Sequence, residues 1–179
     1  NDGTAIANYD GDLTIKNSMI ISNITQFAAV YNTADDVNID INGNYWGNAT
    51  PDGFYKSTGT AMTVDDYVVF NVTVEPEEDV AFKDNVTVKA FFTNSTDGAQ
   101  VTTLPDVEAV TFSSATGTFS AESVYLENNE ATTTFTVGNS PFEITATYPN
   151  MEAVYTGEAK MPEPMIITLN DGNFTEYFD

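Results

Sequence analysis

The side chains that could carry chemistry in this chain are mostly carboxylates, amides and hydroxyls. There are 27 Asp and Glu against five Lys, with no Arg, His or Cys, and the formal net charge is −22 at pH 7. A nucleophile–histidine pair, a thiolate site and a histidine metal cluster are therefore excluded, and no glycine-rich phosphate loop occurs. What remains is acid–base chemistry by paired carboxylates and the binding of hard cations by oxygen.

A glycosidase is the enzyme class that such a chain could still support. It needs two carboxylates about 5 to 10 Å apart in different environments. The residues that could supply them are Asp10, Asp12, Asp35, Asp36 and Asp40. Their turn-like positions favour solvated corners, and a polysaccharide lyase would need cations where residues 1–66 contain only Lys16 and Lys56. We therefore expect a protein without enzymatic activity.

Calcium is the inorganic partner that this composition favours, because it takes hard oxygen ligands. Acidic residues cluster at Asp10 and Asp12, Asp35 and Asp36, Asp65 and Asp66, and residues 75–79. None of these clusters has the spacing of a known calcium loop, so the alternative is an acidic surface that keeps an exported protein soluble. We expect no cofactor, with calcium left open.

The charge and hydropathy patterns also limit the macromolecular partners. A surface of this charge repels phosphate backbones and anionic lipids, so we expect no nucleic-acid partner. The sequence has no run of about 18 apolar residues, and direct membrane insertion of this segment is therefore not expected.

Four aromatic residues near the middle of the first half are candidates for ligand contact or for capping, namely Tyr45, Trp46, Phe54 and Tyr55. Exposed rings can stack on sugars, whereas buried rings close the end of a stacked β-structure against edge-to-edge aggregation. We favour the cap. Sequons that permit N-glycosylation of an exported protein occur at Asn23, Asn48, Asn71, Asn85, Asn94 and Asn173.

A repeat with an offset of 24 residues predicts how residues 1–66 fold. Residues 6–8 align with residues 30–32, residues 12–15 with residues 36–39, and residues 17–18 fall near residues 41–42. Short apolar groups between Asn, Asp and Gly at such a period predict a β-solenoid, with matched Asn side chains stacked along it. Two turns alone are marginal, so we expect further turns upstream in a longer protein.

From Tyr67 onward, apolar and polar residues alternate strictly in seven or eight short runs. Over residues 67–160 this predicts an antiparallel β-sandwich. The chain lacks the Cys pair of antibody domains. Residues 161–179 begin with a Pro162-Glu163-Pro164 linker and continue with a strand and a turn. They either start a next module, which we favour, or add a last strand to the sandwich.

Two stretches resemble known families. The run Asn42-Gly43-Asn44-Tyr45-Trp46-Gly47, followed by Pro51-Asp52-Gly53, resembles the closing turn of right-handed parallel β-helix domains in adhesin-like proteins of methanogenic archaea. Residues 110–113, 117–120 and 131–135 resemble the invasin and intimin type of bacterial immunoglobulin-like domain. The implied fold is all-β: terminal turns and cap of a β-helix in residues 1–66, then an immunoglobulin-like sandwich in residues 67–160.

The resemblance also implies a function. It indicates a non-enzymatic, extracellular cell-surface adhesin segment that contacts a glycan or protein of another cell. The β-helix would be the presentation surface and the sandwich a spacer or stalk. Two alternatives stay open: a fragment of a carbohydrate-active β-helix enzyme, and a structural component of a cell wall or surface layer.

Overall fold

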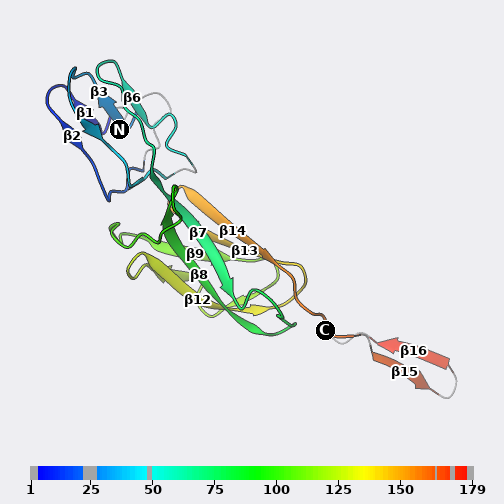
Figure 1. The fold of residues 1–179 in the computed structure, drawn as a ribbon. Helices are drawn as coiled ribbons and strands as arrows, with labels where there is room; N and C mark the ends of the chain where they lie inside the picture. Colours follow the sequence, from blue (N-terminus) through cyan, green and yellow to red (C-terminus); the bar gives the residue numbers. More distant parts are fainter. Residues whose placement is uncertain (1–3, 22–27, 48–49, 164, 170–171, 177–179) are drawn as a thin grey trace.

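The computed structural model describes residues 4–21, 28–47, 50–163, 165–169 and 172–176. All regular secondary structure within them is β-strand, so the predicted all-β class is confirmed. Figure 1 shows a group of short strands at the N-terminal end, a larger body of two sheets next to it, and a hairpin beyond that body. We call the described part of residues 4–66 the coil and residues 67–160 the body.

The coil is built from successive segments of the chain that stack on one another with their short strands parallel, and we call each such segment a pass. One parallel sheet contains, in spatial order, β1 (Ile6–Asn8), β3 (Val30–Asn32) and β6 (Tyr55–Ser57). A second parallel pair consists of β2 (Leu13–Thr14) and β4 (Ile39–Asp40). Val30, Ile41 and Trp46 are buried together in a small apolar core between these passes. Each pass is too short to bury its apolar residues alone, so the passes depend on one another.

The 24-residue alignment is right for the first strand of each pass and wrong for the second. Ile6 pairs with Val30, as the repeat predicts. Leu13, however, pairs with Ile39 and not with Val37, which is an offset of 26. The corner between β3 and β4 is two residues longer than the corner between β1 and β2, and it contains Asp36 in a left-handed conformation (φ 54°).

The structure also has a third pass that the two-turn repeat omits. Tyr55 in β6 lies in parallel register with Val30, 25 residues earlier. No Asn follows in β6 at the position that matches Asn32. Ser57 occupies it, and the Asn32 side-chain nitrogen donates to the Ser57 hydroxyl at 3.1 Å. Because the stacking Asn is replaced, the repeat is not visible in the sequence at this pass.

The body consists of two sheets around one core, and one of these sheets includes a strand of the coil, β5. The five-stranded sheet contains, in spatial order, β10 (Gly117–Phe119), β12 (Glu130–Val137), β8 (Asn85–Asn94), β7 (Tyr67–Glu75) and β5 (Asn44–Tyr45). The four-stranded sheet contains β11 (Ser123–Tyr125), β9 (Ala109–Ser113), β13 (Phe142–Tyr148) and β14 (Met151–Gly157). Alternate residues of both sheets face one apolar cluster, as the period-two pattern predicts.

The last two strands form a sheet of their own. β15 (Met165–Leu169) and β16 (Gly172–Glu176) pair with each other as an antiparallel hairpin. Among the described residues, neither strand pairs with a strand of the body. Whether residues 161–179 start a next module or complete the sandwich stays a prediction.

Candidate functional site: the junction between coil and body

The neighbouring residues Tyr45 and Trp46 lie in two different cores. Tyr45 is 0% exposed and packs in the core of the body, whereas Trp46 is 1% exposed and packs in the core of the coil. Successive side chains of a strand point to opposite faces, which sends one ring into each core. This dipeptide therefore ties the two parts of the chain together.

The ring of Tyr45 completes an aromatic cluster in the body. It packs edge-on against Phe92, with centroids 5.3 Å apart, and against Tyr148, with centroids 5.9 Å apart. Each such pair contributes about 0.5–1.5 kcal/mol beyond the burial of area. The Tyr45 hydroxyl donates to the backbone oxygen of Pro149 at 3.2 Å, and the Tyr148 hydroxyl contacts the Met19 sulfur at 3.5 Å. Tyr45 and Met19 of the coil thus contact Pro149 and Tyr148 of the body, respectively.

Backbone hydrogen bonds also join the coil and the body at the junction. In β5, Tyr45 lies in parallel register with Val68 of β7, so a strand of the coil is the edge strand of the five-stranded sheet. On its other side the same residue bonds to the preceding pass: Ile20 N donates to Tyr45 O at 2.7 Å, and Tyr45 N donates to Ser18 O at 2.9 Å. The joint is therefore made of sheet hydrogen bonds as well as side-chain packing.

Trp46 lies inside the coil beside the other two candidate aromatics. Its ring centroid is 6.4 Å from that of Phe54 and 6.2 Å from that of Tyr55. Its indole Nε1 is buried and has no acceptor among the residues that the structure describes. Tyr45 and Trp46 are closed to solvent, whereas Phe54 and Tyr55 are half-buried and reach it in part.

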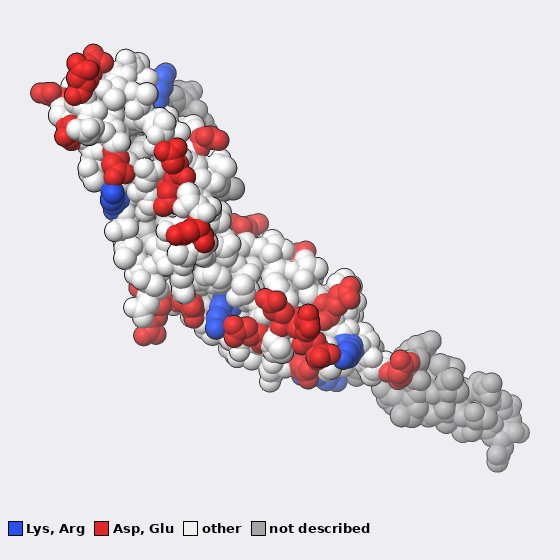
Figure 2. All heavy atoms as spheres, viewed as in Figure 1, with Lys and Arg blue, Asp and Glu red and all other residues white. Residues whose placement is uncertain are grey.

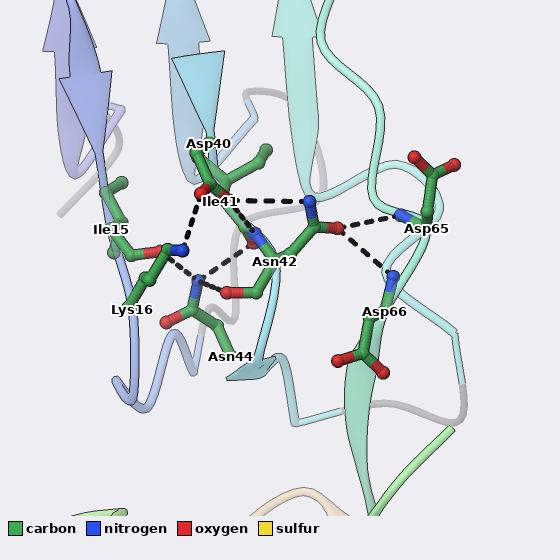
Figure 3. Close-up of polar contacts among 8 residues, drawn as sticks. All are labelled: Ile15, Lys16, Asp40, Ile41, Asn42, Asn44, Asp65 and Asp66. Atoms are coloured by element: carbon green, nitrogen blue, oxygen red, sulfur yellow. Dashed lines mark hydrogen bonds and ion pairs between the residues drawn. The ribbon is translucent and has the colours of Figure 1, made fainter. Parts of the chain in front are cut away.

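Asn44 fixes the corner that precedes the junction (Figure 3). Its side chain is fully buried, and its amide nitrogen donates to Ile15 O at 2.6 Å and to Ile41 O at 2.9 Å. Its amide oxygen accepts from Ser18 N at 3.0 Å. One side chain thus satisfies backbone groups of two successive passes, which a buried corner requires.

Asn42 makes the matching connection to the third pass. Its amide oxygen accepts from Asp65 N at 2.9 Å and Asp66 N at 3.1 Å (Figure 3). The sequence repeat pairs Asn17 with Asn42 as a ladder, and the structure does not. Asn17 instead accepts a hydrogen bond from the Thr103 hydroxyl of the body at 3.0 Å. The ladder exists at the other matched pair, where Asn8 Nδ2 donates to Asn32 Oδ1 at 3.0 Å.

Neighbouring groups lower the pKa of two of the carboxyls that could serve a glycosidase, Asp40 and Asp12. Lys16 Nζ lies 2.6 Å from Asp40 Oδ2, and this hydrogen bond is the main cause that lowers the pKa of Asp40 (Figure 3). The backbone N–H of Asn38 donates to Asp12 at 2.8 Å and lowers the pKa of that carboxyl. A general acid needs a raised pKa, so neither residue has the property that this role demands.

Several residues of the acidic clusters form ion pairs or hydrogen bonds with other side chains of the protein. Asp79 binds Lys160 at 2.6 Å, which lowers the pKa of Asp79, and Glu75 binds Lys89 at 3.3 Å. The Thr96 hydroxyl donates to Asp66 at 3.0 Å. The described residues contain no group of three or more acidic side chains arranged to hold a metal ion. Calcium binding stays a prediction.

The predicted glycosylation sites fall in different surroundings. Asn85 is exposed and accepts a hydrogen bond from Thr136 at 2.7 Å, while Asn71 and Asn94 are half-buried in the same sheet. Asn173 lies in β16. Asn23 and Asn48 lie outside the described residues.

The surface of the molecule is predominantly acidic. Figure 2 shows acidic side chains over both coil and body, with few lysines among them. Among the described residues there is no helix that could cross a bilayer. No family model, no curated protein and no solved structure is significantly similar to this chain.

Proposed function

We propose that this chain is a non-enzymatic segment of an extracellular cell-surface adhesin. In this proposal the coil is the end of a right-handed parallel β-helix, and the body is an immunoglobulin-like sandwich that serves as a spacer or stalk. The observation that carries the proposal is the joint at Tyr45, where one residue belongs to the sheet and the core of the body and also bonds to the preceding pass of the coil.

The parallel passes support the β-helix part of the proposal. Strands β1, β3 and β6 stack in parallel register, β2 and β4 form a second parallel line, and Met19 and Tyr45 form a parallel bridge in a third. The hydrogen bond between Asn8 and Asn32 is the kind of side-chain ladder that stabilises such stacks. Together with the Asn-Tyr-Trp-Gly resemblance, these pairings favour a β-helix end over an unrelated β-fold.

The stiff joint supports the spacer role. Domains within a chain move relative to one another by default, unless their interface is large and apolar. Here the aromatic cluster and the sheet bonds of β5 oppose bending between coil and body. A stalk that holds a binding surface away from a cell benefits from that stiffness, and a strongly acidic surface keeps neighbouring stalks apart.

A binding and turnover experiment tests the function. The full chain, labelled with a fluorophore, is applied to a glycan array and to whole microbial cells, with calcium and with a chelator, and soluble oligosaccharides are incubated in parallel. The proposal predicts saturable binding to glycans or cells and no shortened oligosaccharide. Turnover would instead support the carbohydrate-active enzyme, and self-association without binding would support the wall or surface-layer component.

A further inference from the structure

A hollow of about 350 Å³ opens at one edge of the body. It is lined by Val124, Tyr125, Glu127, Asn128, Glu130 and Thr132. These residues lie where β11 of the four-stranded sheet leads into β12 of the five-stranded sheet. The hollow therefore lies where the chain passes from one sheet to the other, at an edge strand.

The turn beneath the hollow is rigid. Asn128 and Asn129 both adopt left-handed conformations (φ 54° and 60°), and two backbone hydrogen bonds of 2.8 and 3.2 Å join Glu127 and Glu130. Such two-residue turns match the twist of a hairpin. The Asn129 side chain is fully buried and bonds to both Leu104 N and Leu104 O. Backbone and side-chain hydrogen bonds thus hold the turn that lines the hollow.

Tyr125 supplies an exposed aromatic ring beside this turn. The residue is 76% exposed, although its neighbour Val124 packs against the core. β11 is an edge strand that pairs only with β9, where Tyr125 lies opposite Ala109. A large ring that is left in solvent at the rim of a preformed hollow has its π-face available for a ligand.

The charged groups of the hollow are all negative. The Glu130 carboxylate is held in place by hydrogen bonds from the Thr132 hydroxyl (3.2 Å) and from Gln100 Nε2 (3.4 Å). The Glu127 carboxylate accepts no hydrogen bond from the residues that the structure describes, and its residue is exposed. Lys89 lies opposite Thr132 on β8, but its ammonium group binds Glu75 at 3.3 Å.

We propose that this hollow binds a cationic side chain, lysine or arginine, presented by a protein partner. The cation would lie over the ring of Tyr125 and between the carboxylates of Glu127 and Glu130. A cation within about 6 Å of an aromatic face gains about 0.5–1 kcal/mol at an exposed site. A neutral sugar could stack on the same ring, but it would leave two carboxylate charges unmatched, so the charge complementarity favours the cation.

This inference goes beyond the proposed function, which uses the sandwich only as a spacer. The net charge of −22 would steer a basic partner toward the whole molecule. Steering alone cannot distinguish one acidic patch from another. The test must therefore use probes with a single charge and must locate the binding at Tyr125.

The experiment is an NMR titration of the full chain with Nα-acetyl-lysine amide and Nα-acetyl-arginine amide. Nα-acetyl-citrulline amide serves as the neutral probe of arginine shape. We expect saturable shifts of the Tyr125 ring and of the Glu127–Glu130 turn with both cations and weak or no shifts with citrulline. Raising the salt from about 50 mM to about 500 mM should weaken the binding, since exposed charges are screened.

Matched variants locate the site. Tyr125→Ala should weaken binding about two- to fivefold, and Glu127→Gln should also weaken it. Tyr9→Ala removes an equally exposed tyrosine (74%) from the coil, and Glu143→Gln removes an exposed charge from β13, so both should bind as the parent does. Unchanged amide spectra outside the hollow would show that each variant is folded.

Three outcomes would overturn the proposal. The first is the absence of shifts at Tyr125 with either cation. The second is equal binding by the parent and Tyr125→Ala. The third is a response of Tyr125 to glucose, galactose or N-acetylglucosamine without a response to the cations, which would reassign the hollow to sugar stacking. None of these outcomes bears on the glycan-array and cell-binding test of the whole segment.

Discussion

The ring of Tyr45, at the end of the coil, lies edge-on to the ring of Tyr148 in β13, with centroids 5.9 Å apart at an interplanar angle of 70°. The two residues come from opposite sheets of the body and are 103 positions apart in the chain. The side chain of Tyr45, a residue of the coil, is therefore part of the core of the body. The stability of the two parts should therefore be coupled.

Removal of the Tyr45 ring should destabilise the whole described fold. Tyr45→Ala leaves a cavity between Phe92 and Tyr148, and we expect the free energy of unfolding to fall by about 3–5 kcal/mol. Tyr45→Phe keeps the ring and loses only the hydrogen bond to Pro149 O, at a cost of about 1 kcal/mol. Urea denaturation measures both values, and the exposed Tyr9→Ala should stay within about 0.5 kcal/mol of the parent. Equal effects of Tyr45→Ala and Tyr9→Ala would contradict the packing described.

Asn32 should be essential for the coil. Its amide nitrogen donates to Ala34 O, Ser57 Oγ and Thr60 O, and its amide oxygen accepts from Asn8 Nδ2. Asn32→Leu has a similar volume but leaves buried polar groups unpaired, at about 1–3 kcal/mol for each group.

The readout for Asn32→Leu is hydrogen exchange of the coil amides, with unfolding in urea as the global measure. Asn38→Leu is the matched control, because the Asn38 side chain is exposed and bonds only to Asp12. We expect strong loss of protection for Asn32→Leu and little for Asn38→Leu. Similar protection in both variants would show that the ladder is not a stabilising feature.

Alkaline pH should destabilise the protein through its buried tyrosines. Burial, followed by the charges of Glu108 and Asp106, raises the pKa of Tyr148 to about 12, and burial also raises the pKa of Tyr45. An unfolded tyrosine has a pKa of about 10. A raised pKa in the folded state means that this stability is complete below about pH 10 and is lost as the pH rises toward 12.

The alkaline prediction is checked by urea unfolding at a series of pH values between about 9 and 12. Tyr148→Phe removes one titrating group and should give a shallower fall in the free energy of unfolding over that range. An equally steep fall of the free energy of unfolding in Tyr148→Phe would show that other groups cause the loss of stability at alkaline pH.

The Lys16–Asp40 ion pair should lower the pKa of Asp40 measurably and contribute little to the free energy of unfolding. Lys16 holds the pKa of Asp40 below its ordinary value, so the pair stabilises the fold above the unfolded pKa of about 3.9 and the effect is lost as the pH falls through the folded value. Both groups are exposed, and such pairs contribute little. NMR titration of the Asp40 carboxyl should show a higher pKa in Lys16→Met. An unchanged value would rule out the contact.

The sequence predicts the local features of this fold well. The period-two alternation identifies the buried faces of β8 and β13, and the 24-residue repeat identifies the register of Ile6 with Val30. The extra two residues after Asn32 are not visible, because the apolar Val37 stands opposite Leu13 at the 24-residue offset although Ile39 is the residue that pairs with it. The third pass is missed because Ser57 replaces the Asn that would mark it.

The junction is the part that the sequence predicts least. Tyr45 and Trp46 are expected to cover one apolar end together, but strand alternation sends them into separate cores. The partners of Tyr45 are Phe92 and Tyr148, and no local spacing connects residues so far apart. The hollow at Tyr125 is missed for a different reason: its lining lies within residues 124–132, but the sequence pattern does not show that β11 and β12 belong to different sheets.

A distance measurement between two spin labels tests whether coil and body form one stiff unit through Tyr45. Because the chain contains no cysteine, labels attach only where cysteines are introduced, for example at the exposed Tyr9 and Thr156. We expect one narrow distance distribution for the parent and a broader one when Tyr45→Ala is added. A broad distribution in the parent, unchanged by Tyr45→Ala, would contradict a stiff joint between coil and body.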